Sequence, residues 1–301
     1  MWCHVSTPRF LTLPPGVRPQ QIETPAGTFA ALEALPVRGI PERSPALLVP
    51  GLTGSKEDFI AVLQTLAQAG RRVIAIDVRG QFETQGPDDP AAYTCAALGN
   101  DIDAIARAIA PEEPLHLVGH SFGGLITREA VIDGRTKFAS YTLMSSGPGP
   151  IVGPREKAAR VMIREVPEHG VEYLWTNRME PEALAAGVSD EIVTFLRKRL
   201  LANSIVGMTT MTREILTARD RTDELAQIGV PTLVLFGEHD DGWPPAVQSE
   251  MAHRLGAECV VVPGAVHSPA VEAPETTAAA LTRFWNAAES HGVPATTTTT
   301  T

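Results

Sequence analysis

The sequence has little cysteine, no excess of positive charge and no long apolar run. Only Cys3, Cys95 and Cys259 occur among 301 residues, with no paired spacing. They are typical of isolated thiols in a reducing compartment, so we expect a cytoplasmic location. A formal net charge of −10 argues against a nucleic-acid partner, which calls for a basic face. Because no apolar run reaches the length of a membrane span and the first residues lack the pattern of a secretory signal, we expect no membrane partner.

Glycine patterns that bind phosphate and paired clusters of metal-binding residues are also absent. The sequence therefore predicts no cofactor and no metal site. A composition of 44% hydrophobic and 20% charged residues is ordinary for a globular protein. The length exceeds that of most single domains but suits one α/β core with an insertion. We expect a small-molecule substrate as the partner, and a homodimer is left open.

Short apolar runs alternate with helical patterns along most of the chain. The runs typical of strands lie at residues 28–35, 46–50, 72–77, 115–118, 140–144, 232–236 and 259–262. Helical spacing occupies residues 58–69 and 98–109 between them. This alternation predicts an α/β fold with a doubly wound, mostly parallel sheet covered on both faces.

One long segment lacks strands and has only helical patterns, at residues 155–166, 168–179, 190–201 and 205–216. It is too long for a single crossover between strands. We therefore predict an inserted helical cap at residues 150–218, with the core formed by residues 21–149 and 219–288. Residues 1–20, which contain four prolines, are predicted to be an extended N-terminal arm, and residues 289–301, which end in six threonines, a disordered tail.

The sequence Gly119-His120-Ser121-Phe122-Gly123 follows a predicted strand directly and leads into a helical pattern. Gly-x-Ser-x-Gly in this context predicts a nucleophile elbow, in which a strained turn holds the serine above the sheet. The serine then lies at the N-terminus of a helix, whose dipole favours developing negative charge. Ser121 is therefore the candidate nucleophile.

A serine nucleophile needs a base, and the base needs a third group that fixes its tautomer. The strand at 232–236 is followed by three carboxylates, Glu238, Asp240 and Asp241, and the strand at 259–262 by His267. Both loops leave the same edge of the sheet as the elbow, where ligands bind in open parallel sheets. His120 and His239 are the nearest competitors of His267 as the base.

With these motifs in this order, the chain resembles the α/β-hydrolase fold superfamily from about Gly27 to Trp285. The resemblance implies that Asp240 is the triad acid, because it holds the aspartate place of a Gly-x-x-Asp pattern at residues 237–240. It also implies that His267 is the catalytic histidine, in a loop of the type Gly-x-x-His-x-x-x-x-Glu-x-Pro. Asp241 stays open as the alternative acid.

The resemblance also implies an oxyanion hole formed by the backbone N–H groups of Leu52 and Phe122. Pro50 stands where the superfamily usually has histidine, a departure that removes a side chain which often braces this loop. The segment at residues 77–80 resembles the superfamily's Asp-x-Arg-Gly and is interpreted as structural. Residues 81–84 replace the small residues usual after it and are candidates to border the pocket.

A serine at the elbow disfavours dehalogenase and epoxide hydrolase chemistry, which uses an aspartate there. We predict a serine hydrolase that cleaves a carboxylic ester or lactone of a small, largely apolar substrate through an acyl-enzyme. The alternatives are a thioester or C–C bond hydrolase, a cofactor-free perhydrolase, and a ligand receptor without turnover. The residues predicted to bind substrate are Trp175, Met179, Met208 and Trp243; the alternative for the three in the cap is that they form its apolar core. The physiological substrate cannot be read from the sequence, because this fold hosts many chemistries.

Overall fold

A computed structural model of the protein describes residues 6–292. Its centre is an eight-stranded sheet with the order β1-β2-β4-β3-β5-β6-β7-β8. The pairs β1–β2 and β2–β4 are antiparallel, and every other neighbouring pair is parallel. The strands are β1 (Val17–Thr24), β2 (Gly27–Ala34), β3 (Arg43–Val49), β4 (Arg71–Ile76), β5 (Leu115–His120), β6 (Phe138–Met144), β7 (Thr232–Gly237) and β8 (Glu258–Val262). The predicted fold class is confirmed.

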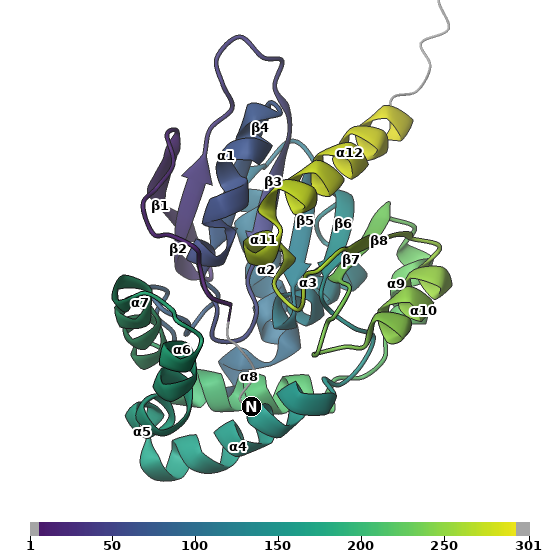
Figure 1. The fold of residues 1–301 in the computed structure, drawn as a ribbon. Coiled ribbons are helices and arrows are strands. Elements are labelled where there is room, and N and C mark those ends of the chain that lie inside the picture. Colours follow the sequence, from purple (N-terminus) through teal and green to yellow (C-terminus); the bar gives the residue numbers. More distant parts are fainter. Residues whose placement is uncertain (1–5, 293–301) are drawn as a thin grey trace, which may run out of the picture.

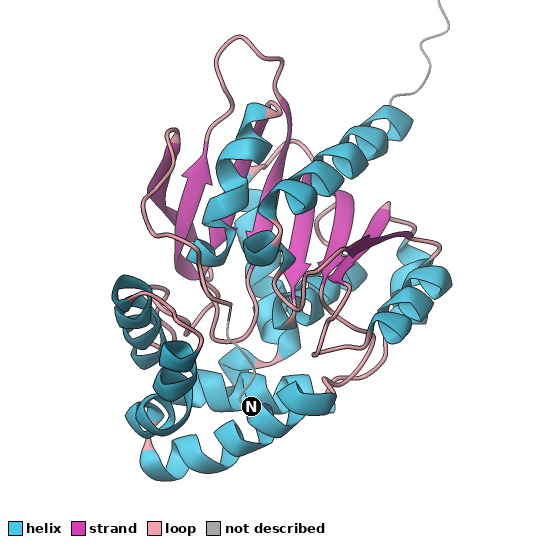
Figure 2. Ribbon diagram, viewed as in Figure 1, coloured by secondary structure: helices cyan, strands magenta, loops and turns pink. Residues whose placement is uncertain are grey.

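Helices cover both faces of the sheet (Figure 2). One face packs against α1 (Ile60–Gln68), α11 (Pro269–Glu272) and α12 (Pro274–Gly292), and the other against α2 (Cys95–Ile109), α3 (Phe122–Asp133), α9 (Thr222–Ile228) and α10 (Pro245–Leu255). The central strands β3 and β5 are almost wholly buried, because each is covered on both sides. Continuous apolar runs such as Ala46–Val49 are what such strands require.

A block of helices lies between β6 and β7, at the end of the sheet to which the parallel strands point (Figure 1). It comprises α4 (Gly153–His169), α5 (Val171–Leu174), η3 (Trp175–Met179), α6 (Glu180–Ala185), α7 (Asp190–Leu201) and α8 (Ile205–Thr217). These helices enclose a small apolar cluster of their own, which includes Leu174, Leu196 and Met208. Their extent agrees with the segment in which only helical patterns occur.

Two short 3-10 helices complete the described elements, η1 (Lys56–Phe59) and η2 (Pro90–Tyr93). Cys95 and Cys259 form no disulfide, and Cys3 lies outside the described residues. Between residues 6 and 292, no helix combines the length and apolar character that crossing a bilayer requires.

The structure corrects both predicted ends of the chain. Residues 17–20 do not belong to an arm but to β1, an edge strand in which Pro19 is tolerated because one side of the strand needs no partner. Residues 289–292 belong to α12, and Glu289 pairs with Arg43 and with the buried Arg71. These partners are more than 200 residues away in the sequence, so no local pattern reveals them. The remainder of the predicted tail, residues 293–301, lies outside the described residues.

Candidate active site

Ser121 lies at the sharp turn between β5 and α3, with φ 54° and ψ −121°. A positive φ is uncommon for a serine and marks local strain at the turn. The turn also packs tightly on its neighbours: a Cβ at Gly123 would lie only 2.5 Å from the carbonyl oxygens of Val49 and Pro50. Glycine is therefore required at position 123, the last position of the Gly-x-Ser-x-Gly motif.

The structure brings Ser121, His267 and Asp240 together from the ends of three strands. His267 Nε2 lies 2.9 Å from Ser121 Oγ, and His267 Nδ1 lies 2.8 Å from Asp240 Oδ1. All three residues are buried. A neutral ring that donates from Nδ1 to the carboxylate leaves Nε2 free to accept the serine proton. The arrangement is that of a nucleophile, a base and an orienting acid.

Asp240, rather than Asp241, faces the histidine. Its Oδ1 accepts hydrogen bonds from the backbone N–H of Gly242 (2.8 Å) and of Trp243 (3.3 Å), and Gln248 Nε2 donates to its Oδ2 (3.0 Å). Burial alone would raise the pKa of this carboxyl. The charge of His267 and these hydrogen bonds outweigh burial and lower the pKa to about 2.

The Asp241 carboxylate instead forms an ion pair with Arg155 of α4. His239 is exposed and lies beside Glu238. Gln248, which holds Asp240, has no sequence signal that would have marked it. A glutamine eight residues beyond the acid belongs to no motif.

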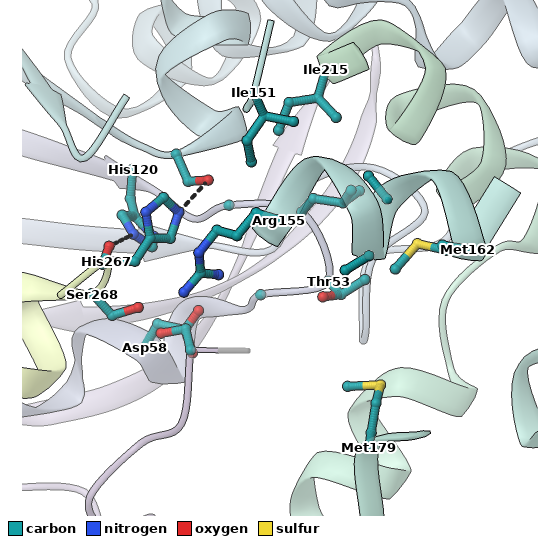
Figure 3. A pocket seen from close by; sticks show the side chains of 17 residues that line it. Thr53, Asp58, His120, Ile151, Arg155, Met162, Met179, Ile215, His267 and Ser268 are labelled. Atoms are coloured by element: carbon teal, nitrogen blue, oxygen red, sulfur yellow. Dashed lines mark hydrogen bonds between the residues drawn. The ribbon is translucent and has the colours of Figure 1, made fainter. Parts of the chain in front are cut away.

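His120 holds the histidine loop to the elbow. Its Nε2–H donates to the backbone carbonyl of His267 at 2.7 Å, and its ring lines the same pocket as Ser121 (Figure 3). Burial, reinforced by the neighbouring His267, lowers the pKa of His120 to about 3. The His120 ring is therefore neutral. A neutral imidazole can donate to a carbonyl without adding a charge to the site. From the sequence, His120 is predicted only as a competitor of His267 for the role of the catalytic base.

The loop that follows β3 passes directly beside the serine. A Cβ at Gly51 would lie 3.0 Å from Ser121 Cβ, and Leu52 lines the pocket together with Ser121. Phe122 is the first residue of α3, so its N–H has no acceptor within the helix. Both predicted donors thus belong to segments that border the serine.

A pocket of about 740 Å³, counting the space open to solvent at its mouth, is lined by Ser121, His120 and His267. Figure 3 shows His120 and His267 at this pocket. Its apolar lining comes from the loop after β3, from the segment before α4, and from α4, η3 and α8. The apolar lining residues are Leu52, Ile151, Ala158, Ala159, Met162, Met179 and Ile215. Its polar lining includes Ser6, Thr53, Asp58, Arg155 and Ser268. The pocket is thus largely apolar, with a few polar groups in its lining.

Of the four residues predicted to bind substrate, the structure brings only Met179 to this pocket. Trp175 and Met208 are buried in the apolar cluster of the helical block, because large side chains at helical spacing form its core. Trp243 stacks beside His267, with ring centroids 6.2 Å apart, and its indole N–H donates to the Gly149 carbonyl. The assignment of these three to the pocket lining is corrected. Met162 is a lining residue that takes their place.

Two charged residues of the lining have partners outside the pocket. Asp58 pairs with Arg199 of α7 at 2.7 Å, and both side chains are buried. Burial raises the pKa of Asp58 to about 6, although Arg199 opposes this shift. Arg155 pairs with Asp241, as described above. Both pairs join the helical block to loops of the core.

Among the described residues, one cluster has the side chains to hold a metal ion, with ligand atoms of Asp240, Asp241 and His267 within 4.8 Å of one another. Its donors are already engaged: both ring nitrogens of His267 bind Ser121 or Asp240, and Asp241 binds Arg155. The geometry fits a hydrogen-bonded triad better than a metal centre.

Comparison with known proteins places this geometry among hydrolases. The model of the Alpha/beta hydrolase family matches residues 46–280. A proline iminopeptidase of Lactobacillus delbrueckii subsp. lactis is 24% identical over 77% of this chain and 86% of its own. A shorter match of 114 residues is 35% identical to a curated relative from Variovorax paradoxus (strain S110), of which the chain spans 42%.

Solved structures show the same fold. A thermophilic esterase from Thermogutta terrifontis is 24% identical, with a TM-score of 0.68 over 90% of this chain and 99% of that one. An enol-lactonase from Burkholderia xenovorans LB400 is 19% identical, with a TM-score of 0.72 over 89% of this chain and 100% of that one. At these identities the likeness concerns the fold alone.

Proposed function

The chain belongs to the alpha/beta hydrolase family, and from that premise we propose that it is a serine hydrolase acting on a carboxylic ester or lactone. The substrate is small and largely apolar, and the reaction passes through an acyl-enzyme on Ser121. The observation that carries the proposal is the buried chain of hydrogen bonds from Asp240 through His267 to Ser121, at the base of the pocket.

In the first half-reaction, His267 Nε2 takes the Ser121 proton while Oγ attacks the ester carbonyl carbon. Asp240, kept ionised by its low pKa, stabilises the imidazolium that forms. The tetrahedral intermediate then collapses, and His267 returns the proton to the departing alkoxide, which leaves as the alcohol. Ser121 is left as an acyl ester.

In the second half-reaction, a water molecule takes the place of the alcohol. His267 removes its proton, the hydroxide oxygen attacks the acyl carbon, and the Ser121 Oγ leaves with the proton returned by His267. In both halves, the negative charge on the carbonyl oxygen is stabilised by the N–H groups of Leu52 and Phe122. Preorganised donors of this kind are each worth ~10²–10³ in kcat.

The pocket supports a small apolar acyl or alkyl group. Ile151, Met162, Met179 and Ile215 form its apolar wall, and all except Ile151 belong to the helical elements α4, η3 and α8. We therefore assign substrate choice to the helical cap predicted at residues 150–218, and the chemistry to the core. Two of the structural neighbours are named an esterase and an enol-lactonase, so the fold is one that can carry out hydrolysis of an ester or a lactone.

A hydrolysis panel tests the proposal and separates it from the thioester hydrolase and the receptor without turnover. The protein is labelled with a fluorophosphonate and then assayed on p-nitrophenyl esters of graded chain length, simple lactones, an acyl thioester and a prolyl amide. We expect labelling at Ser121 and highest turnover on short acyl esters or a lactone. Labelling without turnover on any member would favour the receptor alternative, and absence of labelling would contradict the activated serine. We also propose a cytoplasmic location, from the isolated cysteines, and a homodimer stays open; this panel tests neither.

A further inference from the structure

The loop that carries Leu52 is held in a strained shape. Thr53, the next residue, has φ 59°. This left-handed conformation is a genuine outlier for a β-branched residue, and it persists only where surrounding contacts enforce it. Pro50 occupies the position at which a histidine side chain would brace this loop in the resembled superfamily. The strain must therefore be held by a residue from elsewhere in the chain.

Gln81 makes the contacts that such a brace needs. Its side chain is fully buried, its Oε1 accepts the Thr53 N–H at 2.6 Å, and its Nε2 donates to the Gly51 carbonyl at 3.2 Å. One amide group thus binds the chain on both sides of Leu52. The two hydrogen bonds fix the orientation of the peptide groups that determine where the Leu52 N–H points.

Gln81 itself stands on a rigid turn. Its backbone N–H donates to the Val78 carbonyl (2.9 Å), and its carbonyl accepts from the Thr84 N–H (3.0 Å). The same turn is tied to the start of η1 by the buried Lys56, whose Nζ lies 2.9 Å from Asp77 Oδ2 and whose backbone N–H donates to Asp77 Oδ1 at 2.8 Å. These contacts fix the turn that carries Gln81, and so fix the position from which its side chain reaches the loop.

We propose that Gln81 is a positioning residue that aims the Leu52 N–H at the oxyanion of the tetrahedral intermediate. This inference rests on the proposed function of the pocket. Gln81 is not one of the described residues that line the pocket, so its side chain affects the substrate only through the loop that carries Leu52. Removal of the side chain should therefore weaken the stabilisation of the transition state and leave binding of the ground-state substrate nearly unchanged.

The experiment compares wild-type protein with Gln81→Met, which keeps the length of the side chain but neither hydrogen bond. Concentrations are corrected by titration of active serines. We expect kcat to fall by about 10- to 100-fold, below the ~10²–10³-fold loss of an oxyanion donor, with KM changed by less than about threefold. The inhibition constant of a trifluoromethyl ketone, which forms a tetrahedral oxyanion on the serine, should rise by the same factor as kcat/KM falls.

Gln64→Met is the matched control, because Gln64 also donates its amide to a backbone carbonyl (Pro15) and does not line the pocket. It should leave kcat and the inhibition constant unchanged. If Gln81→Met does not fold, Gln81→Asn, which is too short to reach both loop positions, replaces it with the same expectations. The proposal is overturned if a folded Gln81 variant keeps kcat and ketone affinity within threefold of the wild type. A wild-type protein that neither labels nor turns over would instead contradict the proposed function.

Discussion

Gly242→Ala should disable the triad although it replaces none of the three triad residues. Gly242 lies two residues after Asp240 and packs against the His267 imidazole: a Cβ there would lie 2.6 Å from His267 Cε1 and 2.9 Å from Nδ1. Gly242 is not among the glycines with positive φ, so its backbone suits alanine. Arg155 Cδ, 3.2 Å from the same Cβ position, limits movement in the other direction. The new methyl group must therefore displace the His267 ring.

The size of the displacement follows from the contact distances. Ordinary van der Waals contact begins at 3.4 Å, so the ring has to move by about 0.8 Å. The ring is held by hydrogen bonds of 2.8 Å to Asp240 and 2.9 Å to Ser121, and a shift of this size breaks or badly lengthens one of them. A misplacement of 1 Å can cost ~10²-fold in rate, and overpacking costs about 1–3 kcal/mol of stability. We expect kcat/KM to fall by about 10²-fold in a protein that still folds.

The assay is steady-state hydrolysis of the best ester of the panel, together with thermal unfolding. Gly149→Ala is the control, because its added Cβ would meet nothing closer than the Ala218 carbonyl oxygen at 3.7 Å. It should keep wild-type activity. A folded Gly242→Ala variant with activity within threefold of the wild type would refute the reasoning, because His267 could then not be held where the structure places it.

Three further predictions follow from the triad. Ser121→Ala should abolish fluorophosphonate labelling and lower turnover by ~10⁶ with the fold intact, and a mutant that still labels at another serine would contradict the assignment. Asp240→Asn should lose roughly 10⁴ in kcat, whereas Asp241→Asn should stay within tenfold of the wild type; the reverse order would identify Asp241 as the acid. Asp240, with a pKa of about 2, stays ionised as the pH drops through the range in which Asp58, with a pKa of about 6, gains a proton. Asp58 lines the pocket but is not a member of the triad, so we expect the acid side of the activity profile to be the same in Asp58→Asn; its disappearance there would assign the loss of activity to Asp58.

Much of the fold could be predicted, because buried strands and amphipathic helices leave local periodic patterns. All strands of the parallel part were predicted at their places, from Ala46–Val49 to the strand that ends at Val262. β1 was missed, since an exposed edge strand with Pro19 has neither a continuous apolar run nor clean alternation. The end of α12 was missed because its last turn is fixed by Glu289 and distant arginines.

The substrate pocket was the least predictable part. Trp175, Met208, Met162 and Met179 carry the same apolar signal and all belong to the apolar cluster of the helical block, but only Met162 and Met179 also line the pocket. Both roles need large apolar side chains on amphipathic helices, so the residue type alone does not separate them. Only the packing of helices against one another decides which face meets the cavity.

The sequence by itself determined the nucleophile turn, because Gly-x-Ser-x-Gly between a strand and a helix is a constraint on adjacent residues and their backbone angles. The tertiary structure decided which carboxylate faces His267, and it brought Gln81, His120 and Gln248 to the loops that they hold. Ser121 and His267 are 146 residues apart, and Gln81 is 28 residues from Thr53. Contacts over such separations depend on the order and register of strands in the sheet, which no short motif contains.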